Sequence, residues 1–391
     1  MSRPVVTWPP PGATAQEVVA DLSVLEAAMA GTGPAVAVPG ALDRGDVGVT
    51  RVPDETAVVV ATSGTTGRPK PALLPARALE LAVGGVQDVL GGPGQSMLAV
   101  PPTHITGITV ILRNLWAGFA PTAVTPGHFG PEAFVDLTRR WDPRAPRHYV
   151  TLVPTQLRRV LACPEAVAAA REYDTILVGA APLPAADRDR ALRRGLAIVD
   201  GYGCSETAGG CLYDGRPLPH VLTHLGEGGR IHLGGTQVAL GYLDRPDAAG
   251  AFTTDADEAR WYRTYDHGHR DATGRLVVDG RLDDLINSGG LKVAPTAVED
   301  AIGLARCPGI AEAMVVGVPD PEWGEAVAVV AVPRQGATPG LDGIRACLAD
   351  HLPSHALPRV LHLVASLPVR GPGKPDRVRA RALAGAALSA R

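Results

Sequence analysis

Alternation between short apolar runs and helix-like segments is the feature that most constrains the fold. Between residues 58 and 210, runs rich in β-branched and aliphatic residues are each followed by a segment with helical periodicity. The runs are Val58–Val60, Met97–Val100, His148–Val153, Thr175–Val178 and Leu196–Val199. Repeated strand–helix order is typical of a parallel α/β sheet. We therefore predict an α/β fold, with a smaller β region formed by the glycine-punctuated strands of residues 230–278.

The two ends of the chain have a different character. Residues 1–56 combine a proline-rich start, a helix-like stretch and a Gly/Pro/Asp-rich stretch, and they are predicted to form an edge element and a linker. Beyond the charged, hinge-like run 279–286, segments alternate as helix, strand, strand, helix and strand: 297–304, 313–318, 326–332, 341–352 and 360–363. Because 391 residues exceed what one hydrophobic core usually serves, we predict two domains, 1–280 and a small α+β domain at 281–391.

Composition excludes several classes of function. The formal net charge is −3 and no basic run is present, which argues against nucleic acid or an anionic membrane as the main partner. The five cysteines are scattered without CxxC spacing, so neither a disulfide framework nor a zinc site is predicted. No charged-then-apolar leader opens the chain, and the longest apolar run, 105–120, is interrupted by Arg113 and Asn114. We expect a cytoplasmic protein without a membrane segment that acts on small molecules, and the sequence leaves open whether it forms a homodimer.

The segment that follows the first apolar run, residues 62–70, combines hydroxyl side chains with glycines. Thr62, Ser63, Thr65 and Thr66 supply the hydroxyls, while Gly64 and Gly67 let the backbone bend so that its N–H groups can face an anion. A polyphosphate fits this description, although a surface turn has the same composition. The segment is not a Walker A loop, since Arg68 and Pro69 separate the second glycine from Lys70.

Other strand ends also carry residues suited to ligand binding. His104 follows a predicted strand, and ligands of open α/β sheets bind beyond the carboxyl ends of strands; a structural histidine is the alternative. Arg113 lies in an apolar helix and needs a partner, either an acidic side chain or a ligand carboxylate. The nearly side-chain-free stretch 179–183 suits a flat purine or tight packing. Tyr202 and Glu206 follow another strand, where a ring can stack on a base and a carboxylate can hold Mg²⁺.

Five segments, taken together and in this order, resemble the adenylate-forming superfamily of acyl- and aryl-CoA synthetases, adenylation domains and luciferases. They are TSGTTGRPK (62–70), GAAPLP (179–184), YGCSE (202–206), YRTYD (262–266) with GRLDD (281–285), and GKPDR (373–377). The resemblance covers about residues 55–380. Within the superfamily the chain is most similar to the short o-succinylbenzoyl-CoA synthetases of menaquinone biosynthesis. The similarity rests on SETAGGC (205–211), YDG (213–215), the HITG-x5-R pattern of 104–113 and a short amino-terminal part.

The resemblance implies a ligase that uses ATP, Mg²⁺ and coenzyme A in two steps. A carboxylate and ATP give an acyl-adenylate and pyrophosphate, and a thiol, usually that of CoA, then displaces AMP. Catalysis of attack at phosphorus is mostly positioning plus electrostatic stabilisation by cations. The alternatives are another aryl- or acyl-CoA ligase, an enzyme that loads a carrier protein, and an adenylate-binding protein without turnover.

The resemblance also implies a role for each matched residue. Thr62, Ser63, Gly64, Thr65, Thr66, Gly67 and Lys70 would embrace the β- and γ-phosphates; Gly179, Ala180, Ala181 and Tyr202 would flank adenine; Gly203 and Ser205 would bind elsewhere on the nucleotide; Asp266 and Arg281 would hold the ribose. Glu206 would bind Mg²⁺, and Lys374 would reach the carboxylate and the α-phosphate. His104, Arg113, Gly201 and Gly209 would contact the acid, with His104 also catalytic. The small domain would rotate at the hinge Asp283 and bring Gly289 and Gly290 to the thiol tunnel.

Two positions depart from the pattern of the superfamily. Tyr265 stands where glycine usually precedes the ribose-binding aspartate, and Asn287 stands where lysine is common after the hinge. Tyr265 therefore puts the ribose side of the site in question. Asn287 bears on the thioester step more than on adenylation.

Overall fold

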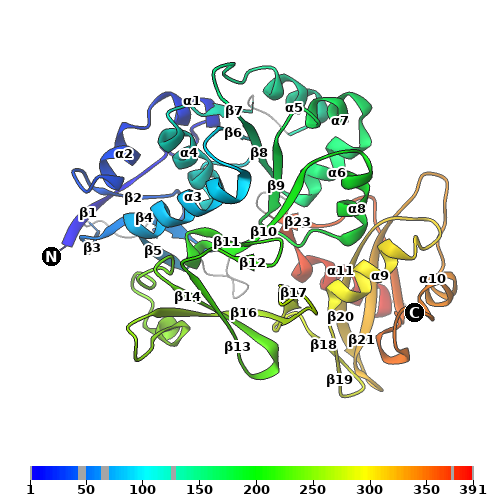
Figure 1. Cartoon of the computed structure of the whole chain (residues 1–391). Coiled ribbons are helices and arrows are strands. Elements are labelled where there is room, and N and C mark those ends of the chain that lie inside the picture. Colours follow the sequence, from blue (N-terminus) through cyan, green and yellow to red (C-terminus); the bar gives the residue numbers. More distant parts are fainter. Residues whose placement is uncertain (1, 43–49, 63–69, 125–128, 371–373, 390–391) are drawn as a thin grey trace. The chain divides into compact units, whose positions relative to one another are not determined.

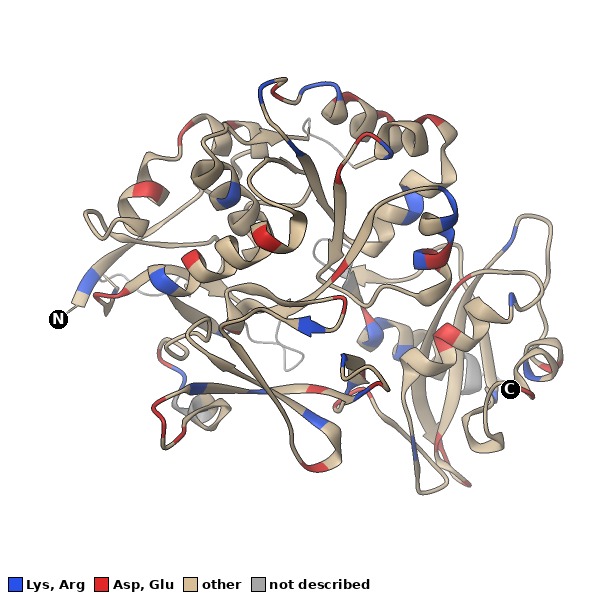
Figure 2. Cartoon of the chain, viewed as in Figure 1, with Lys and Arg blue, Asp and Glu red and all other residues tan. Residues whose placement is uncertain are grey.

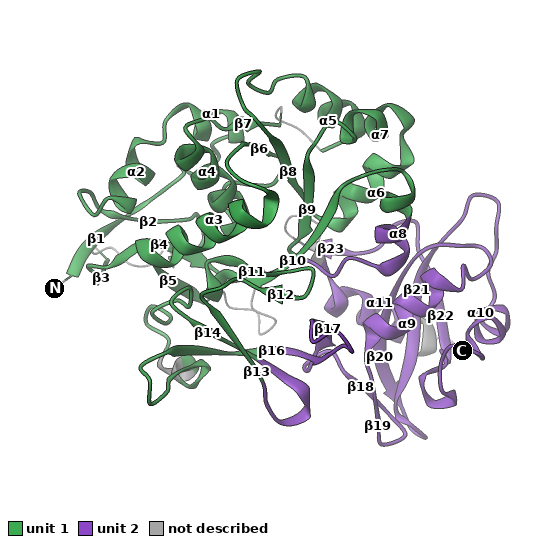
Figure 3. Ribbon diagram, in the orientation of Figure 1, with its two compact units in different colours: residues 1–180, 190–224, 232–264 green, residues 181–189, 225–231, 265–391 purple. Residues whose placement is uncertain are grey.

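The computed structural model describes residues 2–42, 50–62, 70–124, 129–370 and 374–389 (Figure 1). The chain divides into two compact units (Figure 3): unit 1 contains residues 1–180, 190–224 and 232–264, and unit 2 contains residues 181–189, 225–231 and 265–391. Residues 63–69 of the predicted phosphate loop lie outside the described ranges. The domain boundary at residue 280 stays a prediction, since these units are defined by compactness and not by motion.

The first sheet of unit 1 has the strand order β3-β1-β2-β4-β5. Its strands are β1 (Ser2–Thr7), β2 (Ala35–Ala37), β3 (Arg51–Pro53), β4 (Thr56–Ala61) and β5 (Pro71–Pro75), and helices α1 (Ala15–Ala20) and α2 (Ser23–Met29) lie between β1 and β2 in the chain. β1, β2 and β4 are parallel, whereas β3 and β5 are antiparallel to their neighbours. The prediction that residues 1–56 form an edge element and a linker is wrong, because they supply three strands. β2 is only three residues long, too short to show a strand pattern, yet it is fully buried.

The second sheet of unit 1 carries the predicted strand–helix alternation. Its order is β12-β11-β10-β9-β8-β6-β7, with β6 (Gln95–Leu98), β7 (Thr122–Ala123), β8 (His148–Leu152), β9 (Thr175–Gly179), β10 (Ile198–Cys204), β11 (Gly209–Tyr213) and β12 (Arg216–Pro217). Strands β6 to β10 pair in parallel, which confirms the α/β class, and β11 and β12 add an antiparallel edge. The helices are α3 (Ala76–Leu90), α4 (Ile105–Ala117), α5 (Pro131–Thr138), α6 (Pro154–Ala162), α7 (Pro164–Ala170) and α8 (Ala185–Arg193), the last divided between the units.

A third sheet confirms the predicted smaller β region. It is formed by β13 (Val221–Leu225), β14 (Arg230–Gly235), β15 (Phe252–Thr254), β16 (Arg260–Arg270) and β17 (Leu276–Arg281), in the order β13-β14-β16-β15 with β17 paired to β16. β16 and β17 are antiparallel, and their register places Asp266 opposite Arg281. The division between the two units passes through β16.

Unit 2 contains the predicted order of helix, strand, strand, helix and strand. These elements are α9 (Pro295–Leu304), β20 (Ile310–Asp320), β21 (Gly324–Pro333), α10 (Leu341–Leu348) and β22 (Val360–Leu363). They are joined by β18 (Ile286–Ser288), β19 (Leu291–Val293), β23 (Val369–Arg370), β24 (Lys374–Pro375) and α11 (Arg377–Ser389). β21 is apolar along its length because both of its faces are covered. Val327 and Val329 pack with Ile302 and Ile344, while Ala328 packs on the other side with residues of α11.

The cysteines give one result that differs from the prediction. Cys307 and Cys347 form a disulfide between the end of α9 and α10, with a Cα–Cα distance of 5.7 Å. The prediction of no disulfide is therefore wrong for this pair. No spacing motif marks two cysteines that lie 40 residues apart and meet only when α9 and α10 pack together.

Charged residues of both signs are spread over each unit (Figure 2). Many pair locally, as Arg77 and Glu80 do on α3 at 3.3 Å. Exposed pairs of this kind contribute little to stability. Over the described ranges, none of the helices combines the length and the apolar character needed to cross a membrane.

Gly107 and Gly84 provide a matched test of how tightly α4 packs. A Cβ added to Gly107 would overlap the carbonyl oxygen of Pro101, whereas a Cβ added to Gly84 in α3 would have no atom within 4 Å. Because alanine is the better helix former, Gly84→Ala should raise the free energy of unfolding by about 0.5–1 kcal/mol. Gly107→Ala should lower it by about 1–3 kcal/mol, since a backbone carbonyl cannot turn aside. Urea denaturation measures both changes, and equal effects would contradict the close packing of α4 on Pro101.

Candidate active site

The two ends of the predicted phosphate loop lie together where the loop connects strands β4 and β5. The Thr62 N–H donates to the Lys70 carbonyl at 3.0 Å, and the Lys70 N–H donates to Thr62 Oγ1 at 3.4 Å. The predicted loop residues Ser63, Gly64, Thr65, Thr66 and Gly67 lie outside the described residues. Thr62 and Lys70 thus fix where the loop leaves the sheet and where it returns.

Residues 239–243 pair with β5 and bring a distant part of the chain to this hairpin. The Leu73 N–H donates to the Gly241 carbonyl and the Leu240 N–H donates to the Leu73 carbonyl, both at 2.9 Å, and the Leu243 N–H donates to the Pro71 carbonyl at 2.8 Å. The Ala239 N–H donates to the Glu206 carbonyl at 2.8 Å. The 239–243 segment therefore links β5 to the short 3₁₀ helix η1 (Ser205–Thr207) that carries Glu206.

Tyr242 contacts two of the predicted site residues. Its hydroxyl donates to Glu206 Oε1 at 2.6 Å, and Lys70 Nζ lies 5.4 Å from the centroid of its ring. The Tyr262 hydroxyl lies 3.5 Å from that of Tyr242. Burial, followed by the charge of Glu206, raises the pKa of both tyrosines, so both hydroxyls stay protonated at neutral pH. Lys70 and Glu206, predicted separately from the sequence, thus share one neighbour.

The Glu206 carboxylate fits the predicted role as a Mg²⁺ ligand. Glu206 is 5% exposed, and among the described residues only its Oε1 accepts a hydrogen bond. Mg²⁺ is usually bound by one or two carboxylates together with substrate phosphates rather than by an all-protein cage. Accordingly, the described residues contain no group of three His, Cys, Asp or Glu side chains placed to hold a metal.

The ends of β9, β10 and β11 pack backbone against backbone. A Cβ on Gly179 would lie 2.9 Å from the Gly201 carbonyl oxygen, and a Cβ on Gly203 would overlap the Gly209 carbonyl oxygen. Ala180 adopts the left-handed region with φ 66°. The glycines at 179, 201 and 203 thus allow the close approach of these strand ends in unit 1, while Ala181 falls in unit 2.

One predicted boundary in this region is wrong. The sequence predicts that the strand ends at Val199, but β10 continues through Tyr202 to Cys204. The extension forms because Tyr202 pairs with Leu212 and Gly203 pairs with Gly210 of the antiparallel strand β11. Ser205 then begins η1.

Arg113 is the most deeply buried charge among the predicted acid-binding residues. It is 3% exposed, its Nη2 donates to Thr151 Oγ1 at 2.7 Å, and its Nε has no partner. Burial lowers the pKa of Arg113 to about 10. Within the described ranges Arg113 forms no ion pair with an acidic side chain, so the salt bridge predicted as one alternative is not found among these residues. Because a buried charge without a counter-charge is costly, the ligand-carboxylate alternative for Arg113 stays a prediction.

Arg113 belongs to a face of α4 that lies against β11. Ile105, Thr109 and Arg113 are four residues apart and share one side of the helix. A Cβ on Gly209 would lie 3.4 Å from Thr109 Cγ2, and a Cβ on Gly210 would overlap the Tyr213 hydroxyl. Burial raises the pKa of Tyr213, and the nearby charge of Arg113 opposes the shift. Glycines at 201 and 210 thus let the backbone lie close to the Tyr213 side chain, and Gly209 lies next to Thr109.

His104 lies at the other end of the same helix. It is the N-cap residue of α4 and is exposed. His104 and Arg113 are nine positions apart, which corresponds to about 14 Å along a helix axis. Nine positions also correspond to about two and a half helical turns, so His104 does not share the face that carries Arg113.

The predicted ribose and hinge residues lie together in unit 2. Arg281 contacts Asp266 at 3.5 Å and forms a bidentate pair with Asp283 at 2.8 Å for both bonds. Burial alone would lower the pKa of Arg281, but Asp283 and then Asp266 raise it overall. Tyr265 is 45% exposed, with the Arg281 guanidinium 5.7 Å from its ring centroid, so the unusual tyrosine sits on the surface beside the ribose pair.

The predicted thiol-tunnel residues form a hairpin turn. Gly289 and Gly290, with φ 61° and 79°, join β18 and β19. Positive φ at both central residues is typical of a type I′ turn, which explains two consecutive glycines. Asn287 lies opposite Lys292 in this hairpin. The backbone of Lys374 in β24 pairs with that of Arg370 in β23. The side chain of Lys374 lies outside the part of the chain that the structure describes.

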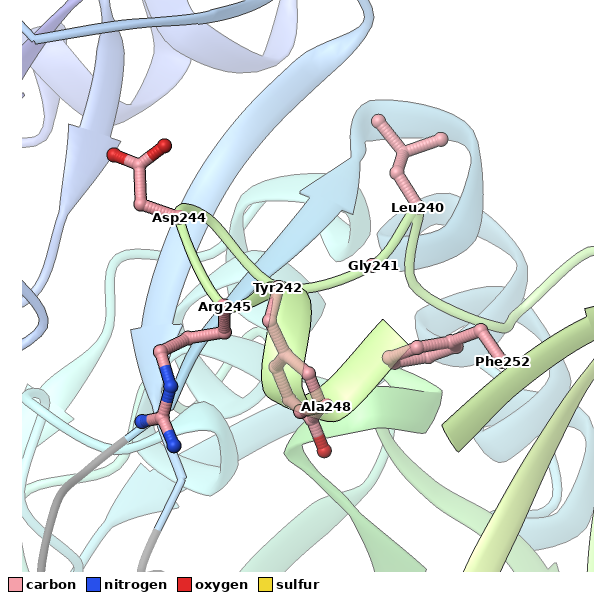
Figure 4. Close-up of a pocket in the computed structure, with 7 residues that line it drawn as sticks. All are labelled: Leu240, Gly241, Tyr242, Asp244, Arg245, Ala248 and Phe252. Atoms are coloured by element: carbon pink, nitrogen blue, oxygen red, sulfur yellow. The ribbon is translucent and has the colours of Figure 1, made fainter. Parts of the chain in front are cut away.

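A pocket of about 410 Å³ lies beside Tyr242. It is lined by Leu240, Gly241, Tyr242, Asp244, Arg245, Ala248 and Phe252, and Figure 4 shows the Tyr242 ring between Arg245 and Phe252. Tyr242 and Phe252 are in edge contact, with centroids 5.0 Å apart. The pocket therefore adjoins the Glu206–Tyr242 pair, while Arg113 is not among its lining residues.

Sequence reasoning missed Tyr242, Thr151 and a role for Tyr213. Tyr242 lies 36 residues from Glu206, and only the pairing of 239–243 with β5 brings them together. Thr151 lies in the stretch 148–153, which the sequence predicts only as a strand. A weak signal existed for Tyr213, which belongs to one of the quoted motifs.

Comparison with known proteins identifies the family. The AMP-binding enzyme family matches residues 11–243, and the AMP-binding enzyme C-terminal domain matches residues 298–374. The chain belongs to the AMP-binding enzyme family, which confirms the resemblance found from the motifs. The chain is therefore an enzyme of the acid–CoA ligase class.

Several relatives are CoA ligases. The chain is 39% identical to the "Probable 2-succinylbenzoate--CoA ligase" of Mycobacterium tuberculosis H37Rv, over 91% of this chain and 93% of that protein. It is 31% identical to sulfoacetate--CoA ligase of Cupriavidus necator, over 97% of this chain and 77% of that one.

Solved structures share the fold. ATP-bound MatB from Rhodopseudomonas palustris has a TM-score of 0.73 at 27% identity and covers 84% of this chain and 68% of its own. The o-succinylbenzoate CoA synthetase of Bacillus subtilis in complex with OSB-AMP has a TM-score of 0.71 at 21% identity, over 91% and 80% of the two chains. At 21% identity, the similarity to the Bacillus subtilis synthetase shows a shared fold and nothing more.

Substitutions of Thr151 test how much the hydrogen bond between Thr151 and the Arg113 side chain contributes to stability. Thr151→Val keeps the shape of the side chain but removes the acceptor of Arg113 Nη2, so it should lower the free energy of unfolding by about 1–3 kcal/mol. Thr151→Ser keeps the hydroxyl and is the matched control. Urea denaturation followed by tryptophan fluorescence measures both, and equal stability of the valine and serine variants would contradict the assignment.

Proposed function

We propose that this chain is an ATP-dependent o-succinylbenzoate--CoA ligase that acts in menaquinone biosynthesis. The main observation is the buried guanidinium of Arg113 on α4, whose Nε has no hydrogen-bond partner among the described residues. An acid with a second carboxylate would supply the missing counter-charge. The 39% identity to a 2-succinylbenzoate--CoA ligase over 91% of the chain supports the same substrate.

The first proposed step joins the acid to ATP. A carboxylate oxygen of the acid attacks the α-phosphorus, a P–O bond forms, and pyrophosphate leaves. The β- and γ-phosphates would be held by loop residues 62–67 and Lys70. The adenosine side would be held by residues 179–181, Tyr202, Gly203 and Ser205. The ribose would be held by Asp266 and Arg281. Glu206 would bind Mg²⁺, which supplies charge neutralisation on the phosphates when bound. His104 would lie near the reacting carboxylate, at the end of α4 opposite Arg113.

The second proposed step transfers the acyl group to CoA. The CoA sulfur attacks the acyl carbonyl carbon, the C–S bond forms, and AMP leaves with the electrons of the C–O bond. In the proposed cycle, domain 281–391 turns at Asp283 between the steps, so that Lys374 serves the first step and the Gly289–Gly290 turn serves the second. The proposal also includes CoA as the thiol acceptor, a location in the cytoplasm and the assembly of the chain as a homodimer.

The lysine content supports the two proposed lysine roles. Lysine occurs three times, at positions 70, 292 and 374, among 37 basic residues. Two of these three are the residues proposed to bind ATP phosphates and the reacting carboxylate. Lysine and arginine are not interchangeable where a compact point charge is needed. In a chain whose basic residues are mostly arginine, the presence of lysine at these two sites favours a chemical requirement over composition.

The acid preference tests the proposed role of Arg113. o-Succinylbenzoate should be the best acid in a panel assayed for CoA-dependent AMP release. Arg113→Ala should lower kcat/KM for o-succinylbenzoate by about 30- to 1000-fold, which corresponds to roughly 2–4 kcal/mol for a broken buried charge pair. Benzoate, which has no second carboxylate, should lose little. An aromatic or fatty acid that exceeds o-succinylbenzoate tenfold, or an equal loss for both acids, would overturn the substrate assignment.

The two half-reactions should fail separately. Lys374→Ala should slow acyl-adenylate formation about 10²- to 10³-fold, since one preorganised charge is lost, while thioester formation from supplied acyl-adenylate stays nearly unchanged. Asp283→Pro should slow the thioester step selectively, because proline fixes φ near −65° and resists hinge rotation. Each variant is the control for the other. Equal slowing of both steps by Lys374→Ala would remove domain alternation from the proposal.

A further inference from the structure

Tyr242 occupies a position between the two charged groups proposed to handle the phosphates of ATP. Its hydroxyl bonds the Glu206 carboxylate, and the face of its ring meets the Lys70 ammonium. We propose that Tyr242 is a positioning residue that fixes the Glu206 carboxylate for the metal and sets its spacing from Lys70, a role that rests on the proposed function of those two residues.

The backbone holds Tyr242 in place from both sides. On one side, residues 240, 241 and 243 bond to Leu73 and Pro71 of β5, the strand that follows Lys70. On the other, the Ala239 N–H bonds to the Glu206 carbonyl. Tyr242 is therefore attached to both the element that carries Lys70 and the element that carries Glu206. A change in its backbone position would strain four backbone hydrogen bonds together.

The ring of Tyr242 is fixed as firmly as its backbone. Phe252 contacts the ring edge-on at 5.0 Å between centroids, and Phe252 in turn packs on Tyr262 at 5.2 Å. These aromatic neighbours restrict the rotation of the ring. The hydroxyl donates to Glu206 Oε1 at 2.6 Å, which is much closer than the Tyr262 hydroxyl at 3.5 Å.

This geometry has a specific consequence for Glu206. With Oε1 held by Tyr242, the carboxylate cannot rotate freely, and Oε2 has no partner among the described residues. Outer partners that orient a metal-binding carboxylate typically change metal affinity or activity 10- to 100-fold when removed. The hydroxyl and the ring of Tyr242 thus act on different groups: the hydroxyl on the metal ligand, the ring on Lys70.

The test compares four variants: Tyr242→Phe, Glu206→Gln, their combination and Tyr173→Phe. The assay is ATP–pyrophosphate exchange driven by o-succinylbenzoate, and it is repeated over a range of Mg²⁺ concentrations. Tyr173→Phe is the matched control, because it removes a buried tyrosine hydroxyl of the same unit that bonds Thr138 at 3.0 Å. Tyr242→Phe should raise the Mg²⁺ concentration for half-maximal rate about tenfold. Tyr173→Phe should change it less than twofold. Thermal unfolding verifies that each variant is folded.

The double variant separates positioning from general damage. If Tyr242 acts through Glu206, adding Tyr242→Phe to Glu206→Gln should change the Mg²⁺ requirement less than twofold further. Tyr242→Leu, which also removes the ring beside Lys70, should in addition raise KM for ATP two- to fivefold above that of Tyr242→Phe. If Glu206→Gln raises the Mg²⁺ requirement and Tyr242→Phe does not, the inference is overturned while the proposed function stands. If Glu206→Gln leaves the requirement unchanged, the proposed metal role of Glu206 fails, and the role of Tyr242 fails with it.

Discussion

The buried charge of Arg113 imposes the strongest demand on this structure. Desolvation of a guanidinium costs several kcal/mol, and one hydrogen bond to Thr151 does not offset that cost. The surrounding elements are arranged around this demand. α4 presents Ile105, Thr109 and Arg113 on one face, and β11 packs against it with Gly209 next to Thr109 and Tyr213 near Arg113. In the proposed function a second carboxylate of the substrate would compensate this buried charge, which is why we propose a dianionic acid as the substrate class.

A second arrangement in unit 1 is organised by the β-sheet and not by a helix. Residues 239–243 add to β5 and carry Tyr242 to Glu206 and Lys70. Both charged groups therefore depend on the same backbone pairing, and their spacing is set by strands with fully buried residues such as Val58 and Leu74. Rigid strands would suit the proposed site, in which Glu206 holds a metal ion and Lys70 binds a polyphosphate.

Sequence reasoning succeeded where the signal was local. Repeated strand–helix order predicted the α/β class, and the position of Arg113 in an apolar helix predicted a charge in need of a partner. It failed where long-range pairing decides. β2 is too short to recognise, β10 extends past Val199 only because β11 pairs with it, and the cysteines at 307 and 347 meet only through helix packing. Tyr242 was missed for the same reason, since its neighbours come from β5 and η1.

The central claim is that the substrate completes the environment of Arg113. A crystal structure of the enzyme with o-succinylbenzoate and AMP, or with the acyl-adenylate, measures this directly. The account predicts a carboxylate oxygen within about 3 Å of Arg113 Nε, with Nη2 still bonded to Thr151. A bound acid whose second carboxylate lies elsewhere, with Nε still unpaired, would contradict it.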